Sequence, residues 1–134
     1  MNSKTEKRLR NIIRNNFGIK SVHIALNVNF MTLIPSTDAM KCEVKKFIGI
    51  LRKRYCNFMY IATIKKSGSN TFRCDMVCNP DIDMKDVELW HNGNAYKTKI
   101  DSFKSLDEVI EILVSGIQST GIYMHSRNLR HDNI

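Results

Sequence analysis

The chain has 134 residues, a length typical of one domain with a core of its own. It carries 21 lysine and arginine residues against 13 aspartate and glutamate residues, and the net charge of +8 favours phosphate-rich or acidic partners. A basic surface that reflects only a lysine-, isoleucine- and asparagine-rich composition is the plainer alternative. A charged N-terminus and the lack of any apolar run long enough to span a bilayer predict a cytoplasmic protein with no membrane partner.

The cysteines and histidines are scattered along the chain. The four cysteines never form the close Cys-x2-Cys pair of a zinc site; they are Cys42, Cys56, Cys74 and Cys78. We therefore predict reduced thiols, with no bound metal and no other cofactor.

The first predicted element is a basic amphipathic helix over about residues 4–17. Its apolar stripe consists of Leu9, Ile12, Ile13 and Phe17. The basic face of this helix could lie on nucleic acid or on an acidic partner, although a solvated outer face on a docked helix is at least as common. Residues 22–34 then alternate as one long strand or two short ones, and Pro35 ends the pattern.

A helix over about residues 38–55 is predicted most clearly. Its apolar positions recur at helical spacing and are Val44, Phe47, Ile48, Leu51 and Tyr55. The last turn carries Arg52, Lys53 and Arg54, where the helix dipole favours cations. Capping alone could explain these three charges, and contact with phosphate is the functional alternative.

A β-hairpin follows, with strands at residues 57–65 and 71–79 joined by a turn. One face of the return strand is apolar and consists of Phe72, Cys74, Met76 and Cys78. Arg73 and Asp75 share the opposite, polar face. Two such groups can converge on one ligand, but an ion pair on a solvated strand face is the simpler interpretation.

The last third of the chain alternates helix and strand. A short helix at residues 83–90 and a turn at 92–94 lead into a strand at 95–100. Apolar residues at 106–117 mark a second amphipathic helix.

A basic tail from about residue 124 to residue 134 ends the chain and is either ordered or frayed. The whole order of elements predicts a single α+β domain over residues 1–134. Its core is an antiparallel sheet of about five strands backed by helices.

Four groups of short motifs also follow one another along the chain. The first is at residues 30–35, the second at 50–55 and 58–62, the third at Leu89-Trp90, Gly93 and 96–101, and the fourth at 126–129. In order and spacing they resemble the rolling-circle replication initiator (Rep) proteins of small plasmids and phages, in the HUH endonuclease superfamily. The resemblance covers nearly all of residues 30–130 and implies an HUH fold, related to the ferredoxin and RRM folds.

In active members of that family, two histidines and often an acidic or amide residue hold a divalent metal at the scissile phosphate, which a tyrosine on a later helix attacks. The resemblance places the acidic ligand at Lys65, the histidines at Arg73 and Asp75, and the tyrosine near Ile112. Lysine and arginine cannot ligate a metal, and Asp75 alone is a poor cation site. The resemblance therefore implies a degenerate site with no catalytic residue.

The expected function is binding of nucleic acid, such as single-stranded or hairpin DNA, without nicking it. The protein would belong to a phage or mobile element in the cytoplasm of a bacterial host, and could regulate replication. Candidate contacts to nucleic acid or an acidic partner are Arg52, Arg54, Lys65, Lys66, Arg73, Lys97, Arg127 and Arg130. The aromatic residues Tyr60, Phe72, Trp90 and Tyr96 either stack on unpaired bases or belong to the core.

Two further hypotheses remain. The chain could be an anti-CRISPR-like inhibitor of a host defence system that binds an acidic or nucleic-acid-handling host protein. It could also be a nuclease with relocated ligands and Tyr123 as a displaced nucleophile, although Tyr123 matches an ordinary aromatic residue ahead of the motif at 126–129. The oligomeric state is not predicted.

Overall fold

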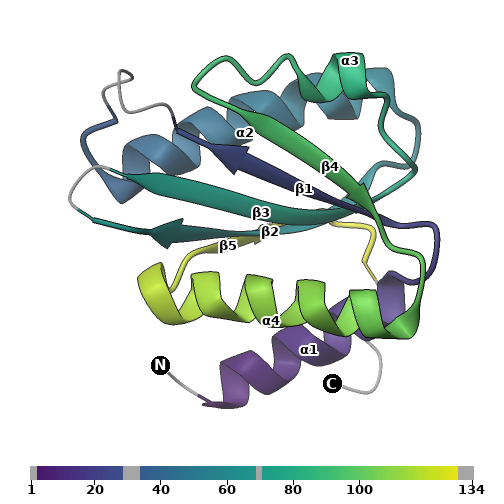
Figure 1. The fold of residues 1–134 in the computed structure, drawn as a ribbon. Coiled ribbons are helices and arrows are strands. Elements are labelled where there is room, and N and C mark those ends of the chain that lie inside the picture. Colours follow the sequence, from purple (N-terminus) through teal and green to yellow (C-terminus); the bar gives the residue numbers. More distant parts are fainter. Residues whose placement is uncertain (1–2, 29–33, 69–70, 130–134) are drawn as a thin grey trace.

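The computed structural model describes residues 3–28, 34–68 and 71–129 (Figure 1). Its elements are α1 (Ser3–Asn16), β1 (Val22–Asn27), α2 (Thr37–Arg54), β2 (Met59–Lys66), β3 (Phe72–Asn79), α3 (Met84–Val87), β4 (Ala95–Lys99), α4 (Phe103–Thr120) and β5 (Tyr123–His125). The five strands form one open sheet in the order β4-β1-β3-β2-β5, and its neighbouring strands are antiparallel. The predicted α+β class is confirmed.

Helices cover both faces of this sheet, so the molecule has three layers (Figure 1). The first core lies between the sheet and α2 and takes Cys74 and Met76 from β3. The second core lies between the sheet, α4 and α1, and takes Ile61 and Val77 from the other face of the strands. Because side chains alternate along a strand, β2 and β3 can supply both cores.

The two long helices have well-defined caps. Ser36 precedes α2, and its hydroxyl accepts a hydrogen bond from the backbone N–H of Ala39 at 3.1 Å. Ser102 forms a capping box with Ser105 at the start of α4. Gly121 ends α4 in the left-handed conformation, with φ of 74°, which glycine adopts without a steric penalty. Both helix predictions are confirmed.

Two predicted elements differ from the structure. The first strand ends at Asn27, so the alternative of one long strand over residues 22–34 is wrong; residues 29–33, which hold most of the motif at 30–35, lie outside the described part of the chain. The helix predicted at 83–90 is only α3, since Trp90 leaves the helical path and enters the first core, where its indole N–H donates to the Asn27 carbonyl at 2.9 Å.

The chain after α4 does not begin a free tail. Residues Tyr123–His125 form β5 along the edge of β2, where Ala62 is opposite Met124. Beyond Thr63 the edge of β2 is closed by the end of α4: the Lys66 N–H donates to the Ser119 hydroxyl at 3.0 Å, and the Thr120 hydroxyl donates to the Ile64 carbonyl at 2.7 Å. The exposed backbone of an edge strand is thus partly satisfied.

The expectation of a solvated face on β3 is wrong. Asp75 is 2% exposed and Val77 is fully buried, because α4 and α1 cover the face that these residues share. The apolar assignment of the other face is confirmed, since Phe72, Cys74, Met76 and Cys78 are all buried. Helices pack on both sides of β3, so neither of its faces meets solvent along most of its length.

Candidate functional site

The four positions that the resemblance assigns to a degenerate nuclease site lie together. They come from β2 (Lys65), β3 (Arg73 and Asp75) and α4 (Ile112), and they line a hollow of about 390 Å³ that we call the hairpin hollow. Its remaining lining residues are Ser67, Glu111 and Ser115. Lys65 lies opposite Arg73 in the β2–β3 register, and this pairing places both long cations at the same mouth.

Asp75 forms the floor of a small charged network. Nε of Arg73 donates to the carboxylate at 3.0 Å and Nη2 donates at 2.9 Å, which is the ion pair expected from the sequence. Nε2 of His23, on the neighbouring strand β1, lies 2.9 Å from Oδ1 of the same carboxylate. The Asp75 side chain is 3% exposed, whereas that of Arg73 is 41% exposed. The buried carboxylate is therefore satisfied from inside the protein, and Arg73 still reaches solvent.

Sequence reasoning missed His23. The sequence feature that could have indicated it is an alternation, in which His23 stands between the apolar residues of the strand, Val22, Ile24 and Leu26. A histidine at the intervening position points to the opposite face of the sheet, where the β1–β3 pairing sets Ala25 against Asp75 and His23 against Val77.

The donor set of the hairpin hollow does not suit a metal ion. Asp75 accepts from Arg73 and contacts His23, while Glu111 accepts two hydrogen bonds from Arg10. Across residues 3–28, 34–68 and 71–129, no group of three histidine, cysteine, aspartate or glutamate side chains is placed to hold a metal. An anion fits the hollow better, because the Lys65 ammonium is exposed at its mouth and has no ion-pair or hydrogen-bond partner among the described residues.

Gly116 allows a close contact between α4 and β2. A β-carbon built at Gly116 would lie 2.4 Å from Oγ1 and 2.8 Å from the β-carbon of Thr63, on β2. The helix therefore touches the strand at this point, and the packing leaves no room for a side chain at position 116. The Thr63 hydroxyl is buried at the contact without a hydrogen-bond partner in the described structure.

The basic N-terminal helix, α1, is docked on α4 with much of its charge paired. Arg10 binds Glu111 through both terminal nitrogens, and Nη2 of Arg14 lies 3.3 Å from Oδ1 of Asp107. A further hydrogen bond of 3.0 Å runs from Gln118 to Glu6. The docked-helix interpretation of this segment is the one that the structure supports.

Several other predicted contacts are engaged within the protein. Arg54 donates to Asp86 at 3.0 Å, and Lys97 donates to Asp81 at 2.9 Å. The hydrogen bond from Lys97 holds the pKa of the Asp81 carboxyl below its ordinary value, against the opposing effect of burial.

Lys66 is not part of the hairpin hollow. It lies on the opposite face of β2 from Lys65, with its ammonium 5.9 Å from the centre of the Phe72 ring. Arg130 lies outside the described residues. Of the candidate cations, then, only Lys65 and Arg73 line the hairpin hollow.

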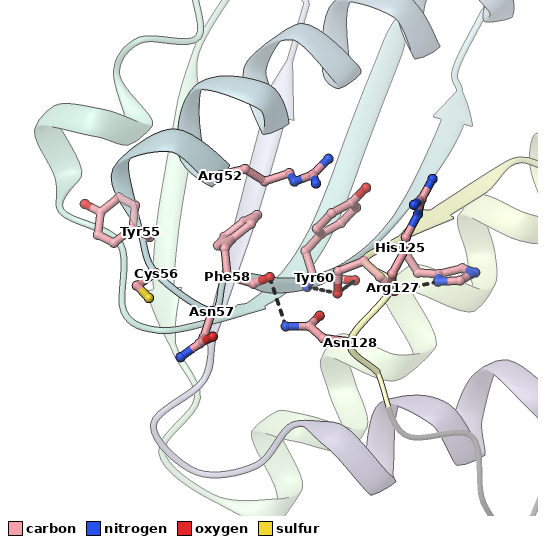
Figure 2. Close-up of a pocket in the computed structure, with 10 residues that line it drawn as sticks. Arg52, Tyr55, Cys56, Asn57, Phe58, Tyr60, His125, Arg127 and Asn128 are labelled. Carbon is pink, nitrogen blue, oxygen red and sulfur yellow. Dashed lines mark hydrogen bonds between the residues drawn. The ribbon is translucent and has the colours of Figure 1, made fainter.

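A second hollow lies at the end of α2 and is lined by both Arg52 and Arg127 (Figure 2). Its volume is about 490 Å³, and we call it the helix-end pocket. Its lining residues are Arg52, Tyr55, Cys56, Asn57, Phe58, Tyr60, His125, Ser126, Arg127 and Asn128. Both arginines were predicted contacts, but nothing in the sequence indicated that they share a pocket.

The aromatic candidates for base stacking are mostly core residues. Tyr60, Phe72 and Trp90 are 9%, 1% and 4% exposed, whereas Tyr96 is 55% exposed. Tyr123 lies on β5, packs against the second core and stacks on the His125 ring with a centroid separation of 5.9 Å. Tyr123 lines neither hollow, and this placement suits the structural role that its sequence context indicates.

The structure is that of an α+β protein with a five-stranded antiparallel sheet between helical layers and two hollows that are each lined by two cationic side chains. Comparisons with protein-family models, with curated proteins and with solved structures gave no match. No described helix combines the length and the apolar character needed to cross a membrane.

Proposed function

We propose that this chain is a catalytically inactive Rep-like protein that binds nucleic acid without nicking it. The supporting observation is the convergence of Lys65, Arg73, Asp75 and Ile112 on the hairpin hollow. These positions were chosen by motif resemblance alone, and they come from three separate elements. They meet because α4 packs on the face of β2 and β3 that carries Lys65, Arg73 and Asp75.

The chemistry of the hollow favours binding over cleavage. Arg73 uses Nε and Nη2 on Asp75, so its Nη1 remains available beside the Lys65 ammonium for phosphate oxygens. Ile112, an aliphatic residue, stands at the position of the family's nucleophile. The two carboxylates that line the hollow, Asp75 and Glu111, already accept hydrogen bonds from other side chains. A phosphate held here would meet cations but no activated tyrosine and no metal-ligating cluster.

Binding of a hairpin DNA, measured by fluorescence anisotropy over a series of salt concentrations, tests this function. We expect the logarithm of the affinity to fall linearly with the logarithm of the salt concentration. Lys65→Gln should weaken binding and lower the magnitude of that slope by about 1, because it removes one phosphate contact. Lys104→Gln, which removes the same charge from an exposed position at the start of α4, serves as the matched control and should preserve the slope.

The same preparations are tested for nicking of supercoiled plasmid with magnesium or manganese, and we expect none. Nicking that Tyr123→Phe abolishes would overturn the assignment as an inactive protein. The absence of any hairpin affinity at low ionic strength would overturn nucleic-acid binding. A stoichiometric protein partner that survives nuclease treatment of a host lysate would then favour the alternative class, an inhibitor of a host defence system.

A further inference from the structure

The helix-end pocket has the charge of an anion site. Arg52 and Arg127 both line it, and none of its lining residues is an aspartate or a glutamate. In Figure 2 the side chains of Arg52, Tyr60 and Arg127 extend toward the same side of the pocket, with the Tyr60 ring between the two arginines. Neither guanidinium has a hydrogen-bond or ion-pair partner among the described residues, unlike those of Arg54 and Arg73.

Backbone contacts hold the two arginines in place. The N–H of Tyr60 donates to the Ser126 hydroxyl at 3.1 Å, and the N–H of Ser126 donates back to the Tyr60 carbonyl at 3.0 Å. Leu129 is buried in the second core, so Arg127 lies between two anchored residues. Arg52 follows Leu51, which is fully buried in the first core. A site with anchored backbones loses less entropy when a ligand binds.

The Tyr60 hydroxyl adds a neutral donor to the two cations. Burial raises the pKa of the Tyr60 phenol, and the nearby charge of Arg52 only partly opposes that effect. The phenol therefore keeps its proton at neutral pH and can donate it in a hydrogen bond to a ligand oxygen. Two guanidinium groups with a hydroxyl between them match the several acceptor oxygens of a phosphate.

We infer that the helix-end pocket binds a phosphate group of a nucleic-acid strand through Arg52 and Arg127. This inference rests on the proposed function, which supplies the strand as the source of the phosphate. The pocket volume of about 490 Å³ has room for the sugar attached to the phosphate.

The pocket forms a contact separate from the hairpin hollow. Tyr60 and Lys65 are five residues apart on β2, about 16 Å at the rise of a strand, and their side chains point to opposite faces of the sheet. A single phosphate cannot touch both. The two sites should therefore contribute independently to the binding of a longer strand.

The test combines measurement of the affinity for a DNA oligonucleotide with NMR observation of the two guanidinium groups. We expect Arg52→Gln and Arg127→Gln each to weaken binding of a single-stranded DNA oligonucleotide on the order of tenfold and to lower the magnitude of the salt slope by about 1. Lys45→Gln removes one charge from an exposed position on the same helix, outside the pocket, and should leave both quantities nearly unchanged. In NMR spectra, the Nε–H signals of Arg52 and Arg127 should shift when the oligonucleotide is added.

The outcomes separate this inference from the proposed function. In one outcome the oligonucleotide binds with an affinity that falls with salt, but the two arginine signals do not shift and both arginine variants bind as Lys45→Gln does. The pocket assignment is then overturned, and nucleic-acid binding stands. If no DNA binds and inorganic phosphate or adenosine monophosphate shifts the two signals, the pocket takes a free phosphate, and both the strand as its source and the proposed function are overturned.

Discussion

Asp75 is the buried acidic residue of the hairpin hollow. Its buried carboxylate accepts hydrogen bonds from Arg73 and contacts His23, and removal of either partner would leave part of a buried charge uncompensated. Arg73 therefore serves the fold as well as any ligand. Lys65 is the better residue for a binding test, because no described side chain depends on its charge.

Gly116 and Gly49 provide a matched pair of substitutions in long helices. Gly116→Ala should lower the free energy of unfolding by roughly 1–3 kcal/mol, because the new β-carbon meets the β-carbon of Thr63 at 2.8 Å and no side-chain rotation relieves that contact. Gly49→Ala in α2 meets nothing within 4 Å and should raise it by up to about 1 kcal/mol through helix propensity. Urea unfolding measures both, and a stabilised Gly116→Ala protein would contradict the close α4–β2 contact.

At the scale of the elements, α1 is held by apolar packing more than by its visible ion pairs. Leu9, Ile12, Ile13 and Phe17 are buried in the second core, while Arg14 and Asp107, which pair across the α1–α4 contact, have side chains that are 48% and 62% exposed. Exposed pairs of this kind contribute little because water screens them. The basic face of α1 thus adds charge to the surface without holding the helix in place.

Two neighbouring positions on α1 test this division. Ile13→Ala should lower the free energy of unfolding by roughly 2–5 kcal/mol, since Ile13 is fully buried and the substitution leaves a cavity. Arg14→Gln should change it by less than about 1 kcal/mol. Thermal unfolding followed by circular dichroism distinguishes the two. Comparable losses for both variants would mean that the ion pairs, and not the core, hold α1 on α4.

At the scale of the whole molecule, the centre of the sheet is closed from both sides. β3 lies between β1 and β2, with α2 on one face and α4 on the other (Figure 1). Cys74 and Cys78 are buried there, and burial raises the pKa of both thiols. Cys42 and Cys56 are exposed free thiols. The chain thus has two thiols that a reagent can reach at the surface and two that it can reach only when the interior opens.

The rate of thiol labelling can therefore measure how often the protein interior opens. In native buffer, a thiol reagent should modify the exposed Cys42 and Cys56 quickly. It should modify Cys74 and Cys78 only as fast as the first core opens, because both side chains are buried in that core. A Cys42→Ser, Cys56→Ser double variant should react only in denaturant. Rapid labelling of that variant in native buffer would show that the sheet opens locally.

The features that could be predicted from the sequence are those with strong local signals. Apolar periodicity predicted α2 and α4, and alternation predicted the hairpin and the inward direction of Cys74 and Cys78. These features depend on neighbouring residues and on helix and strand periods, which are visible in a single sequence. The convergence of Lys65, Arg73, Asp75 and Ile112 could also be expected, but only through the motif resemblance.

Contacts between distant elements determine which polar residues are buried or paired within the protein. Asp75 is buried because helices cover both faces of the sheet, and β5 exists because β2 offers it an open edge. The side chains of Arg10 and Arg14 are paired with α4, whereas Arg52 and Arg127, distant in sequence, meet in one pocket. Each of these outcomes depends on contacts between elements far apart along the chain, and local periodicity carries no information about them.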